Sequence, residues 1–244
     1  MLGLVRRRGP RWVVGNIRNM TPDDDTQLSL RDRLRAIPSL VGNPVGFDPR
    51  VCPPAPRELF LQWFRIAEQG GVPEPHAMTV STVDAAELPD SRMLVLKDIT
   101  PEGAWCFAGN RDSTKGLQLQ ANPVAALLFY WREQLRSVRL RGSVTQSTQE
   151  ESRNDFLARS LQARAAALSG RQSTALDAGS TLTAEVEEAG ARLEADPGLV
   201  PDQWTVWQLH PTEVEFWEGS GTRLHTRLRY ERTDDGWSTS LLRP

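Results

Sequence analysis

Apolar and polar residues alternate with period two along many short segments of the chain, which is the pattern of half-buried β-strands. Turn-forming residues separate these segments, so the connections are short enough to join antiparallel neighbours. The predicted strands are 77–84, 91–99, 104–109, 124–131, 135–146, 203–211, 213–218, 223–232 and 236–243. Because 124–131 is apolar throughout, we expect that strand to be buried on both faces.

Helical periodicity is restricted to fewer segments. The clearest is 56–71, where apolar residues gather close to one face between a starting proline and a Gly-Gly stop. Further helices are predicted within 26–37 and 113–123 and over about 149–162 and 180–195, with the Ala- and Ser-rich segment 162–173 joining the last two. This order predicts a mainly β fold with peripheral helices, a closed or nearly closed antiparallel barrel.

Domain organisation follows from composition along the chain. Residues 1–47 are rich in Pro, Gly, Arg and Asp, and we expect an N-terminal arm that is partly disordered. Within it, residues 1–20 hold five arginines and no acidic residue, which indicates a disordered leader. Residues 48–244 are expected to form a single domain.

Charge and composition exclude several classes of function. The 244 residues carry 29 basic and 31 acidic side chains, and a net charge of −2 offers no overall field for nucleic acid or an anionic membrane. Cys52 and Cys106 are too far apart for a paired zinc motif, and three scattered histidines do not suggest a metal site. Without a membrane span or a secretory signal, the chain is expected to be cytoplasmic.

Basic side chains gather on one face of the predicted strand 223–232. Period two places Arg223, His225 and Arg227 on one side and mainly apolar residues on the other. Guanidinium groups this close repel one another unless water screens them or an anion binds them. The pattern therefore indicates a solvated surface or an anion site. Trp217, just before the preceding turn, either packs in the core or stacks on a flat ligand.

Two further cationic features would suit a phosphate. Ser113, Thr114 and Lys115 stand at a predicted helix start, where free backbone amides and a lysine attract an anion. Arg92 and Lys97 open and close a predicted strand, on opposite faces if that strand is regular. Each feature alone is typical of ordinary surface charge, but together they indicate an anionic, phosphate-bearing ligand.

Several motifs occur in an order that resembles the pyridoxamine 5′-phosphate oxidase family, over about residues 48–244. They are EPHAM, SRMLVLK, STKGLQLQANP, VAALLFYW, the pair Gln172-Ser173, EFWEGSGTRLHTRLRY and the terminal LLRP. The resemblance implies an FMN-binding split β-barrel and a homodimer that builds two sites at its interface from both chains. It also favours the anion-site interpretation of the arginine strand.

The resemblance carries roles to particular residues. The implied FMN contacts are Arg92, Met93, Leu94, Val95, Ser113, Lys115, Gln172, Ser173, Trp217 and Arg227. The implied substrate contacts are Lys97, Arg159, Arg223 and His225, of which His225 and Arg223 would be catalytic. No metal is implied. The expected reaction moves a hydride from a reduced substrate to the flavin, which O₂ then reoxidises.

Departures from the family pattern affect both halves of the expected site. Ala108-Gly109 replaces a Tyr-Thr pair, Thr114 an arginine and Ser137 a glutamine, and each loss removes hydrogen bonds to FMN. Asp155 and Ala163 replace a tyrosine and a serine that hold the substrate phosphate in the vitamin enzymes.

The eroded phosphate pocket is similar to that of the phenazine-biosynthetic branch, flavin oxidases that aromatise reduced tricyclic intermediates. The retained Lys97 is a trait of the vitamin enzymes. We therefore expect an FMN-dependent oxidase of a heterocyclic intermediate. The alternatives are a pyridoxine or pyridoxamine 5′-phosphate oxidase that makes pyridoxal phosphate, or a flavin-binding protein without catalysis.

Overall fold

The structure is a computed structural model that describes residues 29–169, 172–176 and 182–244. By internal contacts the chain divides into residues 1–39 and 40–244. In the first unit, α1 (Leu30–Ala36) is an exposed helix whose first turn is capped by Ser29. Residues 1–28, which make up most of the predicted arm and include the arginines of residues 1–20, lie outside the described residues.

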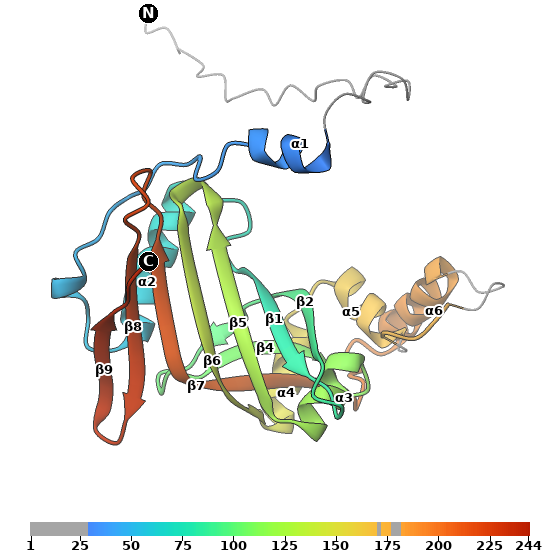
Figure 1. Ribbon diagram of the computed structural model, residues 1–244. Helices are drawn as coiled ribbons and strands as arrows, with labels where there is room; N and C mark the ends of the chain where they lie inside the picture. Colours follow the sequence, from blue (N-terminus) through green and yellow to red (C-terminus); the bar gives the residue numbers. More distant parts are fainter. Residues whose placement is uncertain (1–28, 170–171, 177–181) are drawn as a thin grey trace, which may run out of the picture. The chain divides into compact units, whose positions relative to one another are not determined.

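The second unit is built on one antiparallel sheet (Figure 1). Its strands are β1 (Ala77–Val83), β2 (Pro89–Val95), β3 (Asp98–Ile99), β4 (Trp105–Asn110), β5 (Val124–Trp131), β6 (Arg136–Gln146), β7 (Trp204–Glu218), β8 (Thr226–Thr233) and β9 (Gly236–Leu241). Their order is β2-β1-β5-β6-β7-β4-β3, and β8 pairs with both β7 and β9. The long β6 and β7 therefore form the centre of the sheet.

The first and last strands of this order, β2 and β3, follow each other directly in the sequence. Only Leu96 and Lys97 separate β2 from β3. The amide of Leu96 donates to His76 O at 2.9 Å beside β1, and the amide of Lys97 donates to Cys106 O at 2.8 Å on β4. The sheet thus closes on itself at this point. The predicted mainly β barrel with peripheral helices is confirmed.

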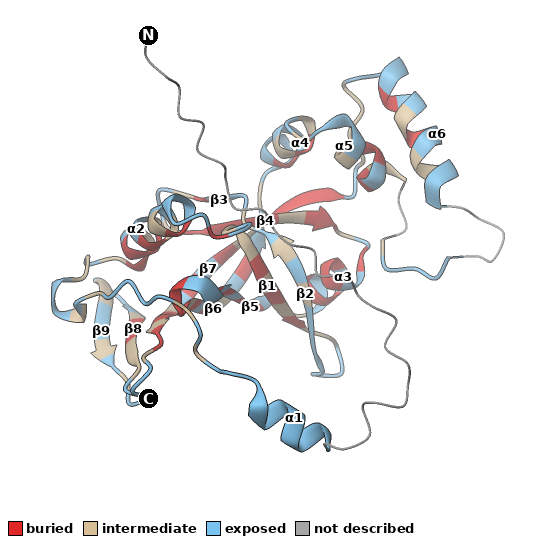
Figure 2. Cartoon of the chain, turned by 90° about the horizontal axis from the view of Figure 1, so that it is seen from above, coloured by how far each residue is buried: buried red, intermediate tan, exposed pale blue. Residues whose placement is uncertain are grey.

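Aromatic side chains fill the barrel together with one face of α2 (Pro56–Gln69). Phe60 of α2 lies 4.4 Å from Trp105 and 5.0 Å from Phe129, measured between ring centroids. Trp63 packs edge-on against Phe216 at 5.2 Å. Figure 2 shows the buried residues along the strands and the inner side of α2, as the amphipathic pattern of 56–71 predicts.

Strand β5 corrects one expectation. Its apolar run is not buried on both faces, because inward residues alternate with residues that the single chain leaves open. Leu127 and Phe129 are fully buried, whereas Val124, Leu128 and Tyr130 are 42%, 40% and 55% exposed. An apolar outer face on a central strand is typical of a surface that a partner covers.

Two strand boundaries also differ from the prediction. The segments 203–211 and 213–218 form the single strand β7, whose register shifts between Arg141 and Gly142 of the neighbouring β6. At this point the backbone of Gly142 comes so close to the His210 carbonyl that any side chain would collide with it, so only glycine fits. Strand β8 begins only at Thr226, so Arg223 and His225 precede it.

The remaining helices lie around the barrel. They are α3 (Thr114–Ala121), α4 (Gln149–Leu157), α5 (Leu161–Leu168) and α6 (Leu182–Ala195), with short 3₁₀ turns at Pro49–Val51 and Arg132–Gln134. The predicted linker 162–173 is wrong in its first half, because Ser160 caps an alanine-rich helix at Ala163 N. No helix among the described residues is long and apolar enough to cross a membrane.

Segment 40–47, assigned to the arm by its composition, contacts the barrel. The amide of Gly46 donates to Glu218 Oε2 at 3.1 Å, and its carbonyl accepts from Arg136 Nη2 at 3.0 Å. Arg136 also donates from Nε to Glu218 Oε2 at 2.7 Å and stacks over Trp63 at 4.1 Å. The predicted domain boundary at residue 47 stays a prediction.

Candidate functional site

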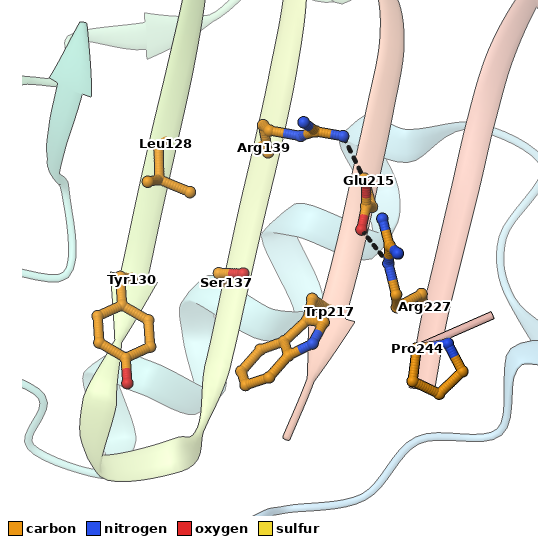
Figure 3. Close-up of a pocket in the computed structure, with 8 residues that line it drawn as sticks. All are labelled: Leu128, Tyr130, Ser137, Arg139, Glu215, Trp217, Arg227 and Pro244. Carbon is orange, nitrogen blue, oxygen red and sulfur yellow. Dashed lines mark hydrogen bonds and ion pairs between the residues drawn. The ribbon is translucent and has the colours of Figure 1, made fainter. Parts of the chain in front are cut away.

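Eight of the predicted site residues line two separate cavities of the chain, whereas Arg92, Met93, Ser113, Ser173, Arg223 and His225 line neither of them. The β4–α3 pocket has a volume of about 460 Å³ and is lined by Leu94, Val95, Lys97, Ala108, Gly109, Lys115, Arg159, Ser160, Ala163, Gln172 and Trp204. The β7–β8 pocket also has a volume of about 460 Å³ and is lined by Leu128, Tyr130, Ser137, Arg139, Glu215, Trp217, Arg227 and Pro244 (Figure 3).

A buried lysine at the start of α3 faces the β4–α3 pocket. Ser113 caps the helix by accepting from Gly116 N and donates to Asn110 O at 2.7 Å. Lys115 Nζ donates to Ser113 Oγ at 2.9 Å and to Gln172 Oε1 at 3.3 Å. Burial, aided by the charge of Arg92, lowers the pKa of Lys115. A lysine and a helix N-terminus together suit a phosphate.

Gly109 makes room for this lysine. A Cβ at Gly109 would lie 2.5 Å from Lys115 Cε and 2.8 Å from Lys115 Nζ. The absence of a side chain on this part of β4 therefore lets the lysine lie across the strand. The departure at Ala108-Gly109 thus has a local structural role, while Thr114, the departure beside the lysine, is exposed.

Arg92 is held by its own chain beside this pocket. Its guanidinium donates to Thr82 Oγ1 at 2.6 Å, to Asp90 Oδ2 at 2.6 Å and to Gln118 Oε1 at 3.0 Å. Hydrogen bonding to Gln118, with the charge of Arg92, lowers the pKa of Asp90. Along β2, Leu94 and Val95 line the pocket, whereas Met93 does not and is 64% exposed.

Lys97 and Arg159, two of the four predicted substrate contacts, belong to one cluster in the wall of the β4–α3 pocket. Lys97 Nζ lies 3.2 Å from Asp155 Oδ1, and Asp155 Oδ2 accepts from Trp204 Nε1 at 2.9 Å. The guanidinium of Arg159 stacks over the Trp204 ring at 4.3 Å and donates to Ala163 O at 3.1 Å. The buried Nε of Arg159 has no partner among the described residues. Burial lowers the pKa of Arg159.

The second cavity lies on the outer face of the sheet, between β5, β6, β7 and β8. Trp217 and Arg227 are opposite each other in the β7–β8 register, and Ser137 is opposite Trp217 on β6. Glu215 accepts from Arg227 Nε at 2.7 Å and from Arg139 Nη2 at 2.6 Å (Figure 3). The pocket therefore combines an aromatic face with an arginine–carboxylate–arginine cluster.

The predicted catalytic pair lies in the turn that leads into β8, not on the strand. Arg223 has a φ of 66° and its amide donates to Ser220 O at 3.0 Å, so the alternation predicted for 223–232 starts too early. The His225 ring lies 5.1 Å from the Trp217 ring, and its Nδ1 accepts from Ser220 N at 3.1 Å. A neutral His225 therefore carries its proton on Nε2.

The two cavities lie toward opposite ends of β7. Trp204, at the start of this 15-residue strand, lines the first cavity, whereas Glu215 and Trp217, near its end, line the second. One chain therefore does not bring Lys115 to Trp217. The predicted FMN contacts fall into these two sets, and Ser173, with a φ of 71°, follows Gln172 at the edge of the first.

Some pocket residues were absent from the sequence prediction. Glu215, Arg139 and Trp204 line the cavities but belong to none of the motif contacts. Glu215 had a signal, because it stands two positions before Trp217 on one strand face. No sequence signal pointed to Trp204, because its contact with Asp155 depends on where α4 packs. Among the described residues no group of histidines, cysteines and carboxylates is arranged to hold a metal ion.

Comparison with known proteins places these features in a family. Residues 66–193 match the family described as pyridoxamine 5′-phosphate oxidase, and residues 204–244 match the pyridoxine 5′-phosphate oxidase C-terminal dimerisation region. The pyridoxine/pyridoxamine 5′-phosphate oxidase of Burkholderia vietnamiensis is 42% identical over 78% of this chain and 90% of its own length. The enzyme of that name from Caulobacter vibrioides is 39% identical over 78% and 85%.

Solved structures agree with this assignment. PhzG from Burkholderia lata, solved with tetrahydrophenazine-1-carboxylic acid, has a TM-score of 0.76 and 28% identity, covering 83% of this chain and all of its own. An FMN-binding protein from Nostoc punctiforme shares the fold, with a TM-score of 0.66 and 19% identity over 78% and 98%. The chain belongs to the pyridoxamine 5′-phosphate oxidase family and is an FMN-dependent oxidoreductase.

Proposed function

We propose that this chain is an oxidase whose FMN site is completed by a second copy of the chain. In this arrangement the β4–α3 pocket of one chain holds the phosphate end of FMN, and the β7–β8 pocket of its partner covers the ring. The matched dimerisation region supports the pairing. The open apolar face of β5, with Leu128 and Tyr130 at the rim of the β7–β8 pocket, supplies a surface for it.

The residues of the β4–α3 pocket fit the phosphate end of the cofactor. Lys115 and Ser113 present a cation and a hydroxyl at a helix start. Arg92 is near enough to affect the charge of Lys115, but it does not line the pocket and is paired with Asp90 at 2.6 Å. Gly109 leaves room for the Lys115 side chain beside β4. On the other side, Trp217 offers a flat face for a ring system, and Arg227 a cation beside it.

FMN supplies the redox chemistry by accepting a hydride, and O₂ would take the electrons onward. The protein positions the substrate and handles its proton. His225, fixed by Ser220 N and packed near Trp217, presents Nε2 as its proton-bearing atom. We assign it the proton-exchanging role and assign Arg223, in the same turn, to substrate anchoring.

The substrate proposal rests on one observation, the ion pair between Lys97 and Asp155. A lysine already neutralised at 3.2 Å has little charge left for a phosphate dianion, and the Asp155 carboxylate would repel that dianion. Ala163 supplies no hydroxyl in the same wall. The wall instead presents Arg159 stacked on Trp204, which suits a planar, carboxylated ring system. The ligand named for PhzG is such a molecule.

Pyridoxine or pyridoxamine 5′-phosphate oxidation is the second candidate. Relatives of that name reach 42% identity, and Lys97 and Arg159 are both retained. Peroxide release by the FMN-loaded protein separates the two proposals. We expect a higher kcat/KM for tetrahydrophenazine-1-carboxylic acid than for pyridoxine or pyridoxamine 5′-phosphate. Rapid turnover of either vitamin phosphate with no turnover of the tricyclic acid would overturn the first proposal.

A further inference from the structure

We infer that Glu215 is a positioning residue that directs the side chain of Arg227 in the β7–β8 pocket. The inference rests on the proposed function, because it gives meaning to Arg227 only if the flavin ring lies beside Trp217. It concerns a residue outside the motif contacts, on the outer face of the sheet. Glu215 is nevertheless only 6% exposed.

A buried carboxylate is costly unless it is fully paired. Glu215 meets this condition with two guanidinium groups from the strands on either side of it. One oxygen accepts from Arg227 Nε at 2.7 Å and the other from Arg139 Nη2 at 2.6 Å. These arginines outweigh the effect of burial, so the pKa of Glu215 is lowered and the group stays ionised.

The strand register shows that Arg227 is not the residue opposite Glu215, so their contact is not a simple consequence of strand pairing. The residue opposite Glu215 on β8 is Arg229, whereas Arg227 is opposite Trp217. Arg229 instead pairs with Glu231 at 2.8 Å. The guanidinium of Arg227 thus reaches diagonally along β7 to Glu215, as Figure 3 shows.

A second contact completes the orientation of Arg227. Its Nη1 donates to Arg243 O at 2.9 Å, while Nε is held by Glu215. A planar guanidinium held at two of its nitrogens has a fixed plane. With Glu215 removed, the Nε anchor is lost, and the side chain, which is 29% exposed, is free to turn toward solvent.

The test compares Glu215→Ala and Arg227→Gln in the FMN-loaded protein, with Glu213→Ala as the matched control. Glu213 lies on the same face of β7 and pairs with Arg139 and Arg141, but it does not line the pocket. The readouts are FMN dissociation, followed by flavin fluorescence, and the flavin midpoint potential. A structural role alone would not move the potential in a defined direction.

The sign of the potential shift is decisive. Reduction adds negative charge to the flavin, so loss of a nearby cation lowers the potential and loss of a nearby anion raises it. If Glu215 positions Arg227, Glu215→Ala lowers the potential as Arg227→Gln does, and both variants weaken FMN binding about tenfold. Glu213→Ala leaves both properties unchanged.

Two results would overturn the inference. A raised or unchanged potential in Glu215→Ala, with a lowered one in Arg227→Gln, would mean that Glu215 does not orient the arginine. If Arg227→Gln itself changes neither property, the proposed placement of the ring fails, and the inference fails with it. Should Glu215→Ala not fold, Glu215→Asp gives the same comparison, because its shorter side chain keeps the charge but withdraws from Arg227.

Discussion

Lys97 Nζ lies 3.2 Å from Asp155 Oδ1, so a cation in the wall of the β4–α3 pocket is neutralised by the chain itself. The other oxygen of Asp155 accepts from Trp204 Nε1, which keeps the carboxylate in place. This pair links the β2–β3 connection, α4 and β7 at one side of the cavity. It bears directly on whether the pocket prefers a phosphate or a neutral or singly charged group.

Asp155→Asn should improve the use of a phosphorylated substrate. The amide oxygen still accepts from Trp204, but Lys97 regains a full unpaired charge. We expect kcat/KM for pyridoxine 5′-phosphate to rise about tenfold, mainly through KM, in a peroxide-release assay. Glu150→Gln removes the same charge from an exposed position on α4 and should have no effect. A variant no better than the parent would show that the ion pair does not limit phosphate binding.

Gly109→Ala should displace Lys115 without unfolding the barrel. The added Cβ would lie 2.5 Å from Lys115 Cε, and a flexible lysine side chain yields before the backbone of β4 does. FMN affinity, measured by fluorescence titration, should fall about tenfold, and the melting temperature should change little. Gly190→Ala, on α6 with open space around it, should leave FMN affinity unchanged. Normal FMN affinity in Gly109→Ala would remove Lys115 from the site.

FMN binding should weaken at alkaline pH because of Lys115. Burial lowers its pKa, so the lysine loses its charge at a pH below its usual value of 10.5. Affinity for the FMN phosphate is full below this lowered pKa and falls as the pH rises through it. Without FMN, the free energy of unfolding should instead increase as the pH rises over the same range, because the cost of the buried charge disappears.

Titrations of FMN at increasing pH test this prediction. The parent should show a loss of affinity that Lys115→Gln, weaker at every pH, does not show. Identical pH profiles for the two proteins would exclude Lys115 as the titrating group.

The strand pattern was predictable because period-two alternation survives wherever one sheet face is buried. It failed where local turn chemistry overrides alternation. The left-handed backbone of Arg223 ends the Ser220–Arg223 turn and delays β8. Similarly, Ser160 caps the helix α5 in an Ala-rich segment that was predicted to be a linker. The position of each motif residue followed from the resemblance, but the partners of Lys97 and Arg227 depend on contacts between distant segments.

The ion pair between Arg136 and Glu218 should dominate the stability of the Gly46 attachment. Arg136 is 1% exposed, and Glu218 satisfies both its Nε and the amide of Gly46. Glu218→Ala should lower the free energy of unfolding by about 3 to 5 kcal/mol, because it leaves a buried guanidinium without its carboxylate. Urea denaturation measures this. Loss of the half-exposed pair in Arg141→Ala should cost less than about 1 kcal/mol. Equal losses of unfolding free energy in Glu218→Ala and Arg141→Ala would contradict the dominant role of the Arg136–Glu218 pair.

Complementation between two defective chains tests the shared site most directly. One chain carries Lys115→Gln, the other Trp217→Ala with Arg227→Gln, and each alone should bind FMN poorly. Mixed dimers, purified through a different tag on each chain, combine an intact β4–α3 pocket with an intact β7–β8 pocket once per dimer. We predict that they bind FMN at about half of their sites, with parental affinity. Mixed dimers that bind no better than the two defective parents would contradict a site built from two chains.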